Sequence, residues 1–302
     1  MSRNIRDKSG NKLLIEEFKF SEMCKDPSIV MVAKRGSGKS WVTRAILNHF
    51  HDVPAGIIIA PTDRMNCFYG NFYPSTFIFY EYKSEVIERI LARQIMLIRK
   101  QKEKAKEGKY IDVRSYIIMD DCLAAKGSWV NDVPIKELLF NGRHYRIMYV
   151  LTMQVPLGIS PDLRNNFDYV FLLADDIISN LKKIHTHYAG IFPDLASFRQ
   201  VFNQLTVDFG SMVLINRGAR ENFLDKVKWY KAPDLTDIHM RFGCDQFRKF
   251  HNKNFNDKWE EKSIPFDIAD YCAKKKRGDN SLNVLKIGHN ESNNHKSNNY
   301  KS

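Results

Sequence analysis

The residues best suited to chemistry lie in the segment 28–44, which reads SIVMVAKRGSGKSWVTR. In it a short apolar run is followed by a glycine-containing turn, a lysine and a serine. Gly36 and Gly38 allow backbone N–H groups to curl around a phosphate, and Lys39 can reach the terminal phosphates of a nucleotide. The Ser40 hydroxyl is then placed to hold a magnesium ion. The pattern predicts a phosphate loop for ATP and Mg²⁺, made of Ala33, Lys34, Arg35, Gly36, Ser37, Gly38, Lys39, Ser40 and Trp41.

A pair of carboxylates follows another apolar run further along the chain. Residues 116–119 have the composition of a buried strand, and Asp120 and Asp121 come directly after it. Magnesium bound to a triphosphate prefers hard oxygen ligands, so we expect Asp120 to hold the metal together with Ser40. A neighbouring carboxylate can orient and deprotonate an attacking water, which is the role predicted for Asp121. An acidic pair after a strand also occurs in simple turns, but its position downstream of a phosphate loop favours catalysis.

Three further polar side chains are candidates for the same chemistry. Gln154 follows the apolar run 147–151 closely and can hydrogen-bond a γ-phosphate or the attacking water. Arg143 is a candidate to stabilise charge in the transition state from a neighbouring subunit, and Arg164 is a second candidate for that task. A structural ion pair is the alternative for either arginine, and the sequence does not separate the two.

A sheet of parallel strands would bring these residues together, because the carboxyl ends of parallel strands share one edge. Buried strands are predicted at 29–32, 56–60, 76–80, 116–119, 147–151 and 168–173, with two antiparallel edge strands at 212–215 and 227–230. Helices are predicted at 41–50, from 84 until the helix ends in the lysine-rich run 99–109, and at 135–140, 176–188 and 194–205. The alternation predicts an α/β fold with a mostly parallel central sheet.

An aromatic-rich segment follows the strand predicted at 56–60. Phe68, Tyr69, Phe72 and Tyr73 lie close together in it. Such side chains can stack on a base or on nucleic acid, but an aromatic packing layer is the interpretation we favour.

The composition restricts the compartment and the partners. The chain has 302 residues, 43% of them hydrophobic, and a formal net charge of +12, which indicates a polyanion or an acidic surface as partner. A basic surface that serves only solubility is the alternative. Five scattered cysteines without a Cys-x-x-Cys pair predict a reducing compartment and neither a disulfide framework nor a zinc site. There is no signal-peptide pattern and no apolar run of the ~20 residues that span a bilayer, so we expect a soluble intracellular protein.

Changes in composition along the chain predict its domain organisation. Residues 1–24 are expected to form an N-terminal arm or an edge strand, and residues 25–240 a phosphate-loop ATPase domain. Residues 241–272 are expected to form a C-terminal extension, and residues 273–302 a basic, disordered tail.

The order of the motifs adds a family resemblance. AKRGSGKS, IIMDDC, NGRH, LTMQ and PDLRNNFDYVFLL follow one another along the chain. In this order the sequence resembles the genome-packaging ATPases of nucleocytoplasmic large DNA viruses, the poxvirus-type group within the FtsK–HerA superfamily of P-loop NTPases. The resemblance covers about residues 29–173, and two positions depart from it. Ala33 stands where the pattern has a glycine, and Asp121 stands where many members of the superfamily carry the longer Glu.

The resemblance implies a RecA-like core with helices on both faces of the sheet and the Gln154 strand between the phosphate-loop and acidic-pair strands. It also implies ATP hydrolysis by a homo-oligomeric ring that drives double-stranded DNA into a capsid. The expected partner is therefore a capsid or portal-vertex protein, and the expected location is the virion and the virus assembly site in the host cytoplasm. The matching residues are Lys39 and Ser40 for phosphate and magnesium, Asp120 for magnesium, Asp121 as the catalytic carboxylate and Gln154 as the sensor.

Two other classes of function stay open at this point. The first is a P-loop phosphotransferase such as a nucleoside or nucleotide kinase, in which Arg143 and Arg164 would serve a lid. A strand that ends in an acidic pair and another that ends in Gln154 suit water activation better. The second is a virion protein that binds DNA and ATP but has lost hydrolysis.

Overall fold

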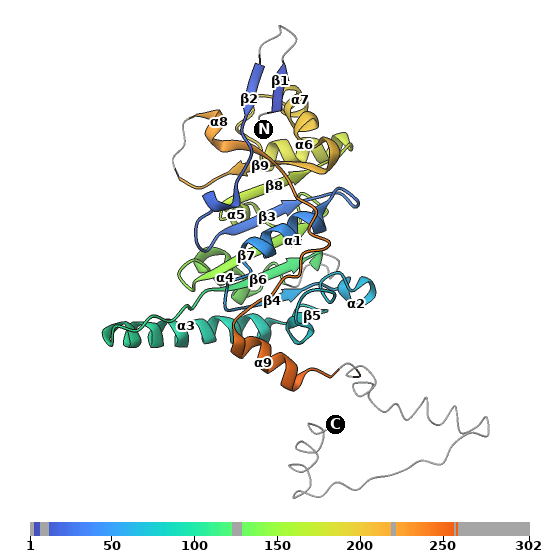
Figure 1. Ribbon diagram of the computed structural model, residues 1–302. Helices are drawn as coiled ribbons and strands as arrows, with labels where there is room; N and C mark the ends of the chain where they lie inside the picture. The colour runs from blue at the N-terminus through green and yellow to red at the C-terminus, as the bar shows by residue number, and fades with distance from the viewer. Residues whose placement is uncertain (1–2, 7–11, 123–128, 219–221, 257, 259–302) are drawn as a thin grey trace, which may run out of the picture. The chain divides into compact units, whose positions relative to one another are not determined.

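The computed structural model describes residues 3–6, 12–122, 129–218, 222–256 and 258 (Figure 1). The chain divides into two compact units, residues 1–248 and residues 249–302. The domain boundaries predicted at residues 24, 240 and 272 stay predictions. The predicted basic tail, residues 273–302, lies outside the described residues.

A central sheet organises the first unit. Its strands are β3 (Ser28–Val32), β4 (Ala55–Ile59), β5 (Ile78–Phe79), β6 (Ser115–Asp120), β7 (Ile147–Met153), β8 (Tyr169–Leu173), β9 (Gly210–Ile215) and β10 (Val227–Lys231). They form one eight-stranded sheet in the order β10-β9-β8-β3-β7-β6-β4-β5. The strands from β8 to β5 are parallel, and β9 and β10 extend the sheet in the antiparallel sense. The predicted α/β class and mostly parallel sheet with antiparallel edge strands are confirmed.

The position of β7 brings distant parts of the chain to one edge of the sheet. β7 pairs with β3 on one side and with β6 on the other, which is the order that the resemblance implies. In this register Val32 lies opposite Met153, and Asp120 lies opposite Thr152. The carboxyl ends of the three strands therefore meet at one place.

Helices cover both faces of the sheet, as expected (Figure 1). The helix α1 (Lys39–His49) packs on one face, where its Val42 and Ile46 join Ile29 and Met31 of β3 in one apolar core. The other core includes Val30 and Val32 together with apolar residues of α3 (Ser84–Lys106), α4 (Val133–Asn141), α6 (Ile178–His187) and α7 (Leu195–Leu205). This alternation along β3 follows from the period of two in a strand that is buried on both sides.

The described residues also form several short elements and one further helix. These are α2 (Asp63–Asn66), α5 (Pro161–Arg164), α8 (Phe223–Lys226), α9 (Asp245–Asn254) and the 3₁₀ turns Phe20–Glu22, Ser75–Phe77 and Val207–Phe209. Within the described ranges, none of the helices combines the length and the apolar composition that crossing a bilayer requires.

Two segments differ in detail from the sequence prediction. The strand expected at 76–80 is a 3₁₀ turn followed by the two-residue strand β5. The helix α3 agrees with the prediction, because it ends at Lys106, within the lysine-rich run 99–109. The N-terminal residues form a separate antiparallel pair, β1 (Arg3–Arg6) with β2 (Lys12–Ile15), after which the Phe18 N–H donates to the Trp229 carbonyl of β10 at 2.7 Å.

Gly56 provides a test of the packing between β4 and β6. It lies opposite Tyr116, and a Cβ added to Gly56 would lie 2.2 Å from the Tyr116 ring, which is fully buried. Gly56→Ala should therefore lower the free energy of unfolding by about 1–3 kcal/mol, because the core has no room for the methyl group. Urea denaturation measures this. Gly190→Ala is the control, since nothing lies within 4 Å of the added Cβ there, and equal effects of the two substitutions would contradict this packing.

Candidate active site

The phosphate loop connects β3 to α1 in the conformation that its sequence predicts. Gly36 and Gly38 have φ angles of +79° and +97°, in the left-handed region that favours glycine. Ala33, at the position where the pattern has its first glycine, does not have a positive φ, so a Cβ is tolerated there. The Ala33 N–H donates to the Met153 carbonyl at 2.9 Å, which ties the loop to the end of β7. The loop leads directly into the N-terminus of α1 at Lys39, and the first backbone N–H groups of a helix can bind an anion.

The acidic pair lies at the end of β6, beside the end of β7. Thr152 donates its hydroxyl hydrogen to Asp120 Oδ1, and the Asp121 N–H donates to the Thr152 oxygen at 3.2 Å. Asp121 has a φ of +53°, which is unusual for a residue other than glycine and indicates a backbone held in place by its surroundings. One threonine side chain therefore fixes the direction of both acidic residues.

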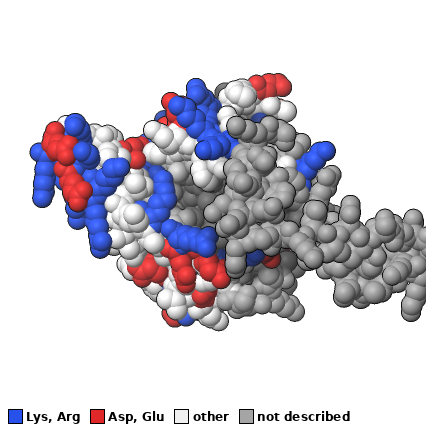
Figure 2. All heavy atoms as spheres, turned by 90° about the horizontal axis from the view of Figure 1, so that it is seen from below, with Lys and Arg blue, Asp and Glu red and all other residues white. Residues whose placement is uncertain are grey.

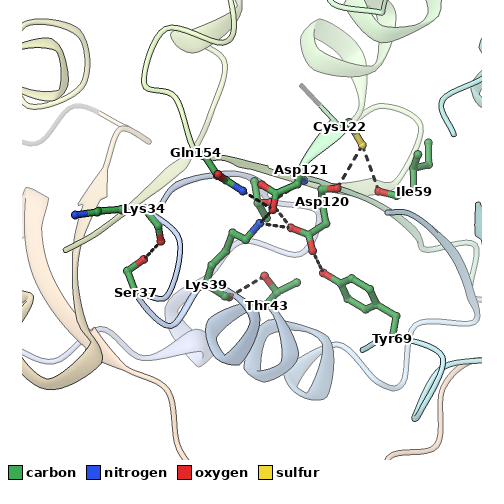
Figure 3. A network of polar contacts seen from close by, with 11 residues as sticks. Lys34, Ser37, Lys39, Thr43, Ile59, Tyr69, Asp120, Asp121, Cys122 and Gln154 are labelled. Carbon is green, nitrogen blue, oxygen red and sulfur yellow. Dashed lines mark hydrogen bonds and ion pairs between the residues drawn. The ribbon is translucent and has the colours of Figure 1, made fainter. Parts of the chain in front are cut away.

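Lys39 lies between the two carboxylates (Figure 3). Its Nζ is 2.9 Å from Asp120 Oδ1 and also pairs with Asp121 Oδ2. Gln154 donates from Nε2 to the same Asp121 oxygen at 3.0 Å. Four side chains predicted from the sequence are thus in direct contact, although they come from three separate strand ends.

These residues line a cleft of about 730 Å³, within the range of small-molecule sites. Every predicted loop residue except Ser37 lines it, together with Asp120, Asp121 and Gln154. Ser37 instead donates its hydroxyl hydrogen to the Lys34 carbonyl at 2.6 Å and so stabilises the turn of the loop.

The residues present fit a magnesium ion that arrives with a phosphate ligand. Ser40 and Asp120 both line the cleft and offer the hard oxygen atoms that Mg²⁺ prefers. Within the described residues, no group of three or more His, Cys, Asp or Glu side chains is placed to hold a metal ion by itself. With Ser40 and Asp120 as protein ligands, a magnesium ion would take phosphate oxygens and water as further ligands.

The two arginine candidates lie away from this cleft. Arg143 follows α4 and precedes the amino end of β7, at the opposite edge of the sheet, where it is exposed and lines a separate cavity of about 200 Å³. Arg164 is only 6% exposed, and its guanidinium lies 5.7 Å from the centre of the Tyr188 ring. Of the two, Arg143 alone has the exposure needed to act on a neighbouring subunit, and its role stays a prediction.

Three further residues contact the acidic pair or the phosphate loop without having been predicted to do so. Thr152 belongs to the same LTMQ motif as Gln154, so the sequence indicates that it lies near the end of the strand. The sequence does not indicate its contact with the acidic pair. Tyr69 belongs to the aromatic segment and donates its hydroxyl hydrogen to Asp120 Oδ2 at 3.0 Å (Figure 3). Burial raises the pKa of Tyr69 well above its usual range, so its hydroxyl stays a donor.

Phe209 is the third unpredicted residue. It lines the cleft while 61% exposed, and a Cβ added to Gly38 would lie 3.3 Å from the Phe209 Cβ. Asp208 and Phe209 have φ angles of +55° and +58°, a costly conformation for residues with side chains. Nothing in the sequence of this turn indicates that it presents an aromatic ring at the rim of the phosphate loop.

The site defines an α/β domain of the P-loop type. Its features are the loop between a parallel strand and a helix, the lysine of that loop and the acidic end of another strand.

No family model matches the sequence. The chain is 49% identical over 246 residues to the uncharacterized protein L437 of Acanthamoeba polyphaga mimivirus, covering 82% of this chain and 86% of that protein. It is 30% identical over 236 residues to the uncharacterized protein 075L of Invertebrate iridescent virus 6, covering 77% and 88%. The chain therefore belongs to one family with these proteins of large DNA viruses.

Solved structures are similar at a lower level. The genome packaging NTPase B204 of Sulfolobus turreted icosahedral virus 2, in complex with AMPPCP, is 15% identical with a TM-score of 0.48, covering 70% of this chain and 100% of that one. The conjugation coupling protein TcpA of pCW3 is 13% identical with a TM-score of 0.47, covering 83% and 69%. Similarities of this size carry no conclusion about function.

The ion pairs of Lys39 can be tested through stability. Lys39→Met should lower the free energy of unfolding by about 3 kcal/mol, because it leaves two carboxylates, whose side chains are 8% and 16% exposed, without their cation. In the double variant Lys39→Met/Asp121→Asn, the loss should be smaller than the sum of the two single losses. Urea denaturation of the four proteins measures this coupling. Lys182→Met, an exposed lysine on α6, is the control, and strictly additive losses would mean that the ion pair does not stabilise the site.

Proposed function

We propose that this protein is a Mg²⁺-dependent ATPase that moves double-stranded DNA and packages a viral genome into its capsid. The observation that carries the proposal is the meeting of Lys39, Ser40, Asp120, Asp121 and Gln154 in one cleft at the ends of three adjacent strands. Each of these side chains has the chemistry that its predicted role requires.

In this proposal the loop and Lys39 bind the β- and γ-phosphates, while Ser40 and Asp120 hold the magnesium ion. Bound magnesium neutralises charge on the phosphates and so supplies electrostatic stabilisation. Asp121 accepts a proton from the attacking water. Gln154, whose amide already contacts Asp121, orients that water and responds to the loss of the γ-phosphate. Because Lys39 contacts both carboxylates, the incoming phosphates compete with them for its charge.

Double-stranded DNA as the substrate is supported by the net charge of +12 and by the family resemblance of the sequence. The second half of α3 and the following loop, residues 99–109, form a basic surface beyond the sheet (Figures 1 and 2). Its charge is partly compensated, since Lys104 and Lys109 pair with Glu107 at 2.8 and 3.2 Å. We propose a ring of subunits in which Arg143 faces the neighbouring cleft. The capsid or portal vertex would be the docking partner, and the virion and the assembly site in the host cytoplasm the location.

Phosphate release tests the proposed activity. Linear duplex DNA should raise the steady-state rate of ATP hydrolysis, and the stimulation should fade between 50 and 200 mM salt as counterions compete for the DNA backbone, a change of several-fold or more. Asp121→Asn should lower the rate roughly 10²- to 10⁴-fold while ATP still binds. Asp162→Asn, an exposed residue on α5 outside the cleft, should leave the rate unchanged.

Other outcomes would point to the alternatives. Phosphate transferred to an added nucleoside, in place of free phosphate, would identify a phosphotransferase. ATP binding without turnover, with or without DNA, would identify a protein that has lost hydrolysis. Hydrolysis that does not respond to DNA at either salt concentration would contradict the DNA-moving part of the proposal.

We further propose that Phe209 stacks on the base of the nucleotide, which would explain an exposed ring on a strained turn beside the loop. Phe209→Ala should weaken ATP binding roughly tenfold or more, because stacking of a base on an aromatic side chain is worth about 1–3 kcal/mol. Inorganic tripolyphosphate has no base, so it should bind the variant as it binds the wild type. Displacement of a fluorescent ATP analogue measures both affinities. Phe140→Ala, an exposed ring outside the cleft, is the matched control, and equal losses for ATP and tripolyphosphate would rule out stacking.

A further inference from the structure

Asp120 is fixed through both of its carboxylate oxygens. Its Oδ1 accepts a hydrogen bond from Thr152 on the neighbouring strand, and its Oδ2 accepts one from Tyr69 at 3.0 Å. Tyr69 is only 1% exposed, and Asp120 is 6% exposed. A carboxylate can otherwise rotate about its last side-chain bond, and donors on two different oxygens remove that freedom.

Tyr69 is itself held by a buried carboxylate. Asp63, which is 2% exposed, accepts the backbone N–H of Tyr69 at 2.6 Å and that of Gly70 at 3.2 Å. Burial raises the pKa of Asp63, and these two N–H groups oppose that rise. The Tyr69 ring is also in edge-to-face contact with Phe68, at 4.9 Å between ring centres. The backbone that carries Tyr69 is therefore anchored independently of Asp120.

The segment that carries Tyr69 is also part of the cleft wall. Thr62, Asp63, Met65, Asn66 and Phe68 line the cleft beside Tyr69, opposite residues of the phosphate loop. Tyr69 thus connects this wall to the acidic pair. Neither interpretation of the aromatic segment from the sequence, stacking on a base or a packing layer, includes this hydrogen bond.

We infer that Tyr69 is a positioning residue that holds the Asp120 carboxylate in the orientation required to bind magnesium with the nucleotide. The inference rests on the proposed function, since it assigns a role toward the metal of that same site. Partners of this kind, which contact a ligating carboxylate and not the metal, orient the ligand and commonly change metal affinity 10- to 100-fold when they are removed. When phosphates draw Lys39 away from Asp120, the bonds from Tyr69 and Thr152 are the contacts that keep the carboxylate in place.

The test removes only the hydroxyl group, in the variant Tyr69→Phe. A fluorescent ATP analogue is held at fixed concentration and Mg²⁺ is titrated, with bound fluorescence as the readout, so hydrolysis is not required. The Mg²⁺ concentration at half-maximal binding should rise roughly 10- to 100-fold. At saturating Mg²⁺ the variant should bind the analogue about as well as the wild type, since the phosphate loop is unchanged.

Tyr116→Phe is the matched control. Tyr116 is a buried tyrosine in the same apolar core, and its hydroxyl donates to the Tyr73 hydroxyl at 2.7 Å, outside the residues that line the cleft. It loses a buried hydrogen bond between two neutral hydroxyl groups, so its Mg²⁺ midpoint should stay at the wild-type value while its thermal stability falls. A shift in Tyr69→Phe but not in Tyr116→Phe supports positioning.

The outcomes separate the inference from the proposed function. An unchanged Mg²⁺ midpoint in Tyr69→Phe would overturn the positioning role, and so would an equal shift in Tyr116→Phe. Tyr69 would then serve only the packing of the core. The proposal that the cleft binds a nucleotide would not be affected. If the wild type itself binds the analogue without any dependence on Mg²⁺, the proposed use of magnesium fails, and the inference fails with it.

Discussion

The charge balance around Lys39 is the interaction on which the rest of the site depends. One ammonium group lies between two carboxylates that have little exposure to water. Buried carboxylates need a nearby cation, because desolvation of an unpaired charge is costly. A phosphate ligand that attracts Lys39 therefore leaves Asp120 and Asp121 in need of another positive charge. A divalent cation held by Ser40 and Asp120 would supply it, so this arrangement would couple the binding of anion and metal.

The order of the strands makes this balance geometrically possible. Lys39 begins α1 after β3, and the acidic pair ends β6, yet these two strands are not neighbours in the sheet. β7 separates them and contributes Thr152 and Gln154, whose side chains contact the acidic pair. The gap of one strand leaves a cleft in which a ligand can reach all three strand ends. The antiparallel strands β9 and β10 lie beyond β8, and Phe209, in the 3₁₀ turn directly before β9, also lines the cleft.

Much of this site could be predicted from the sequence, because each of its motifs is a short continuous segment. The phosphate loop and the two aspartates each follow an apolar strand directly. Their side chains therefore lie at a strand end, whatever the order of the strands in the sheet. The order of the strands came only through the family resemblance, since buried parallel strands have similar compositions. Tyr69, Phe209 and the positive φ of Asp121 depend on contacts between distant segments and leave no local pattern. The end of α3 within the lysine-rich run 99–109 agrees with the prediction, because the helix stops at Lys106.

The positive φ of Asp121 compensates for its short side chain. Aspartate is one methylene shorter than the glutamate that many members of the FtsK–HerA superfamily, which the sequence resembles, carry there, so from an ordinary strand its carboxylate would not extend as far. At Asp121 the chain leaves the extended conformation for a φ of +53°, and the carboxylate there reaches both Lys39 and Gln154. Asp and Asn are the residues other than glycine that tolerate this conformation best, whereas Glu is less suited to it. The departure from the wider sequence pattern thus goes together with a backbone turn that directs the shorter side chain into the cleft.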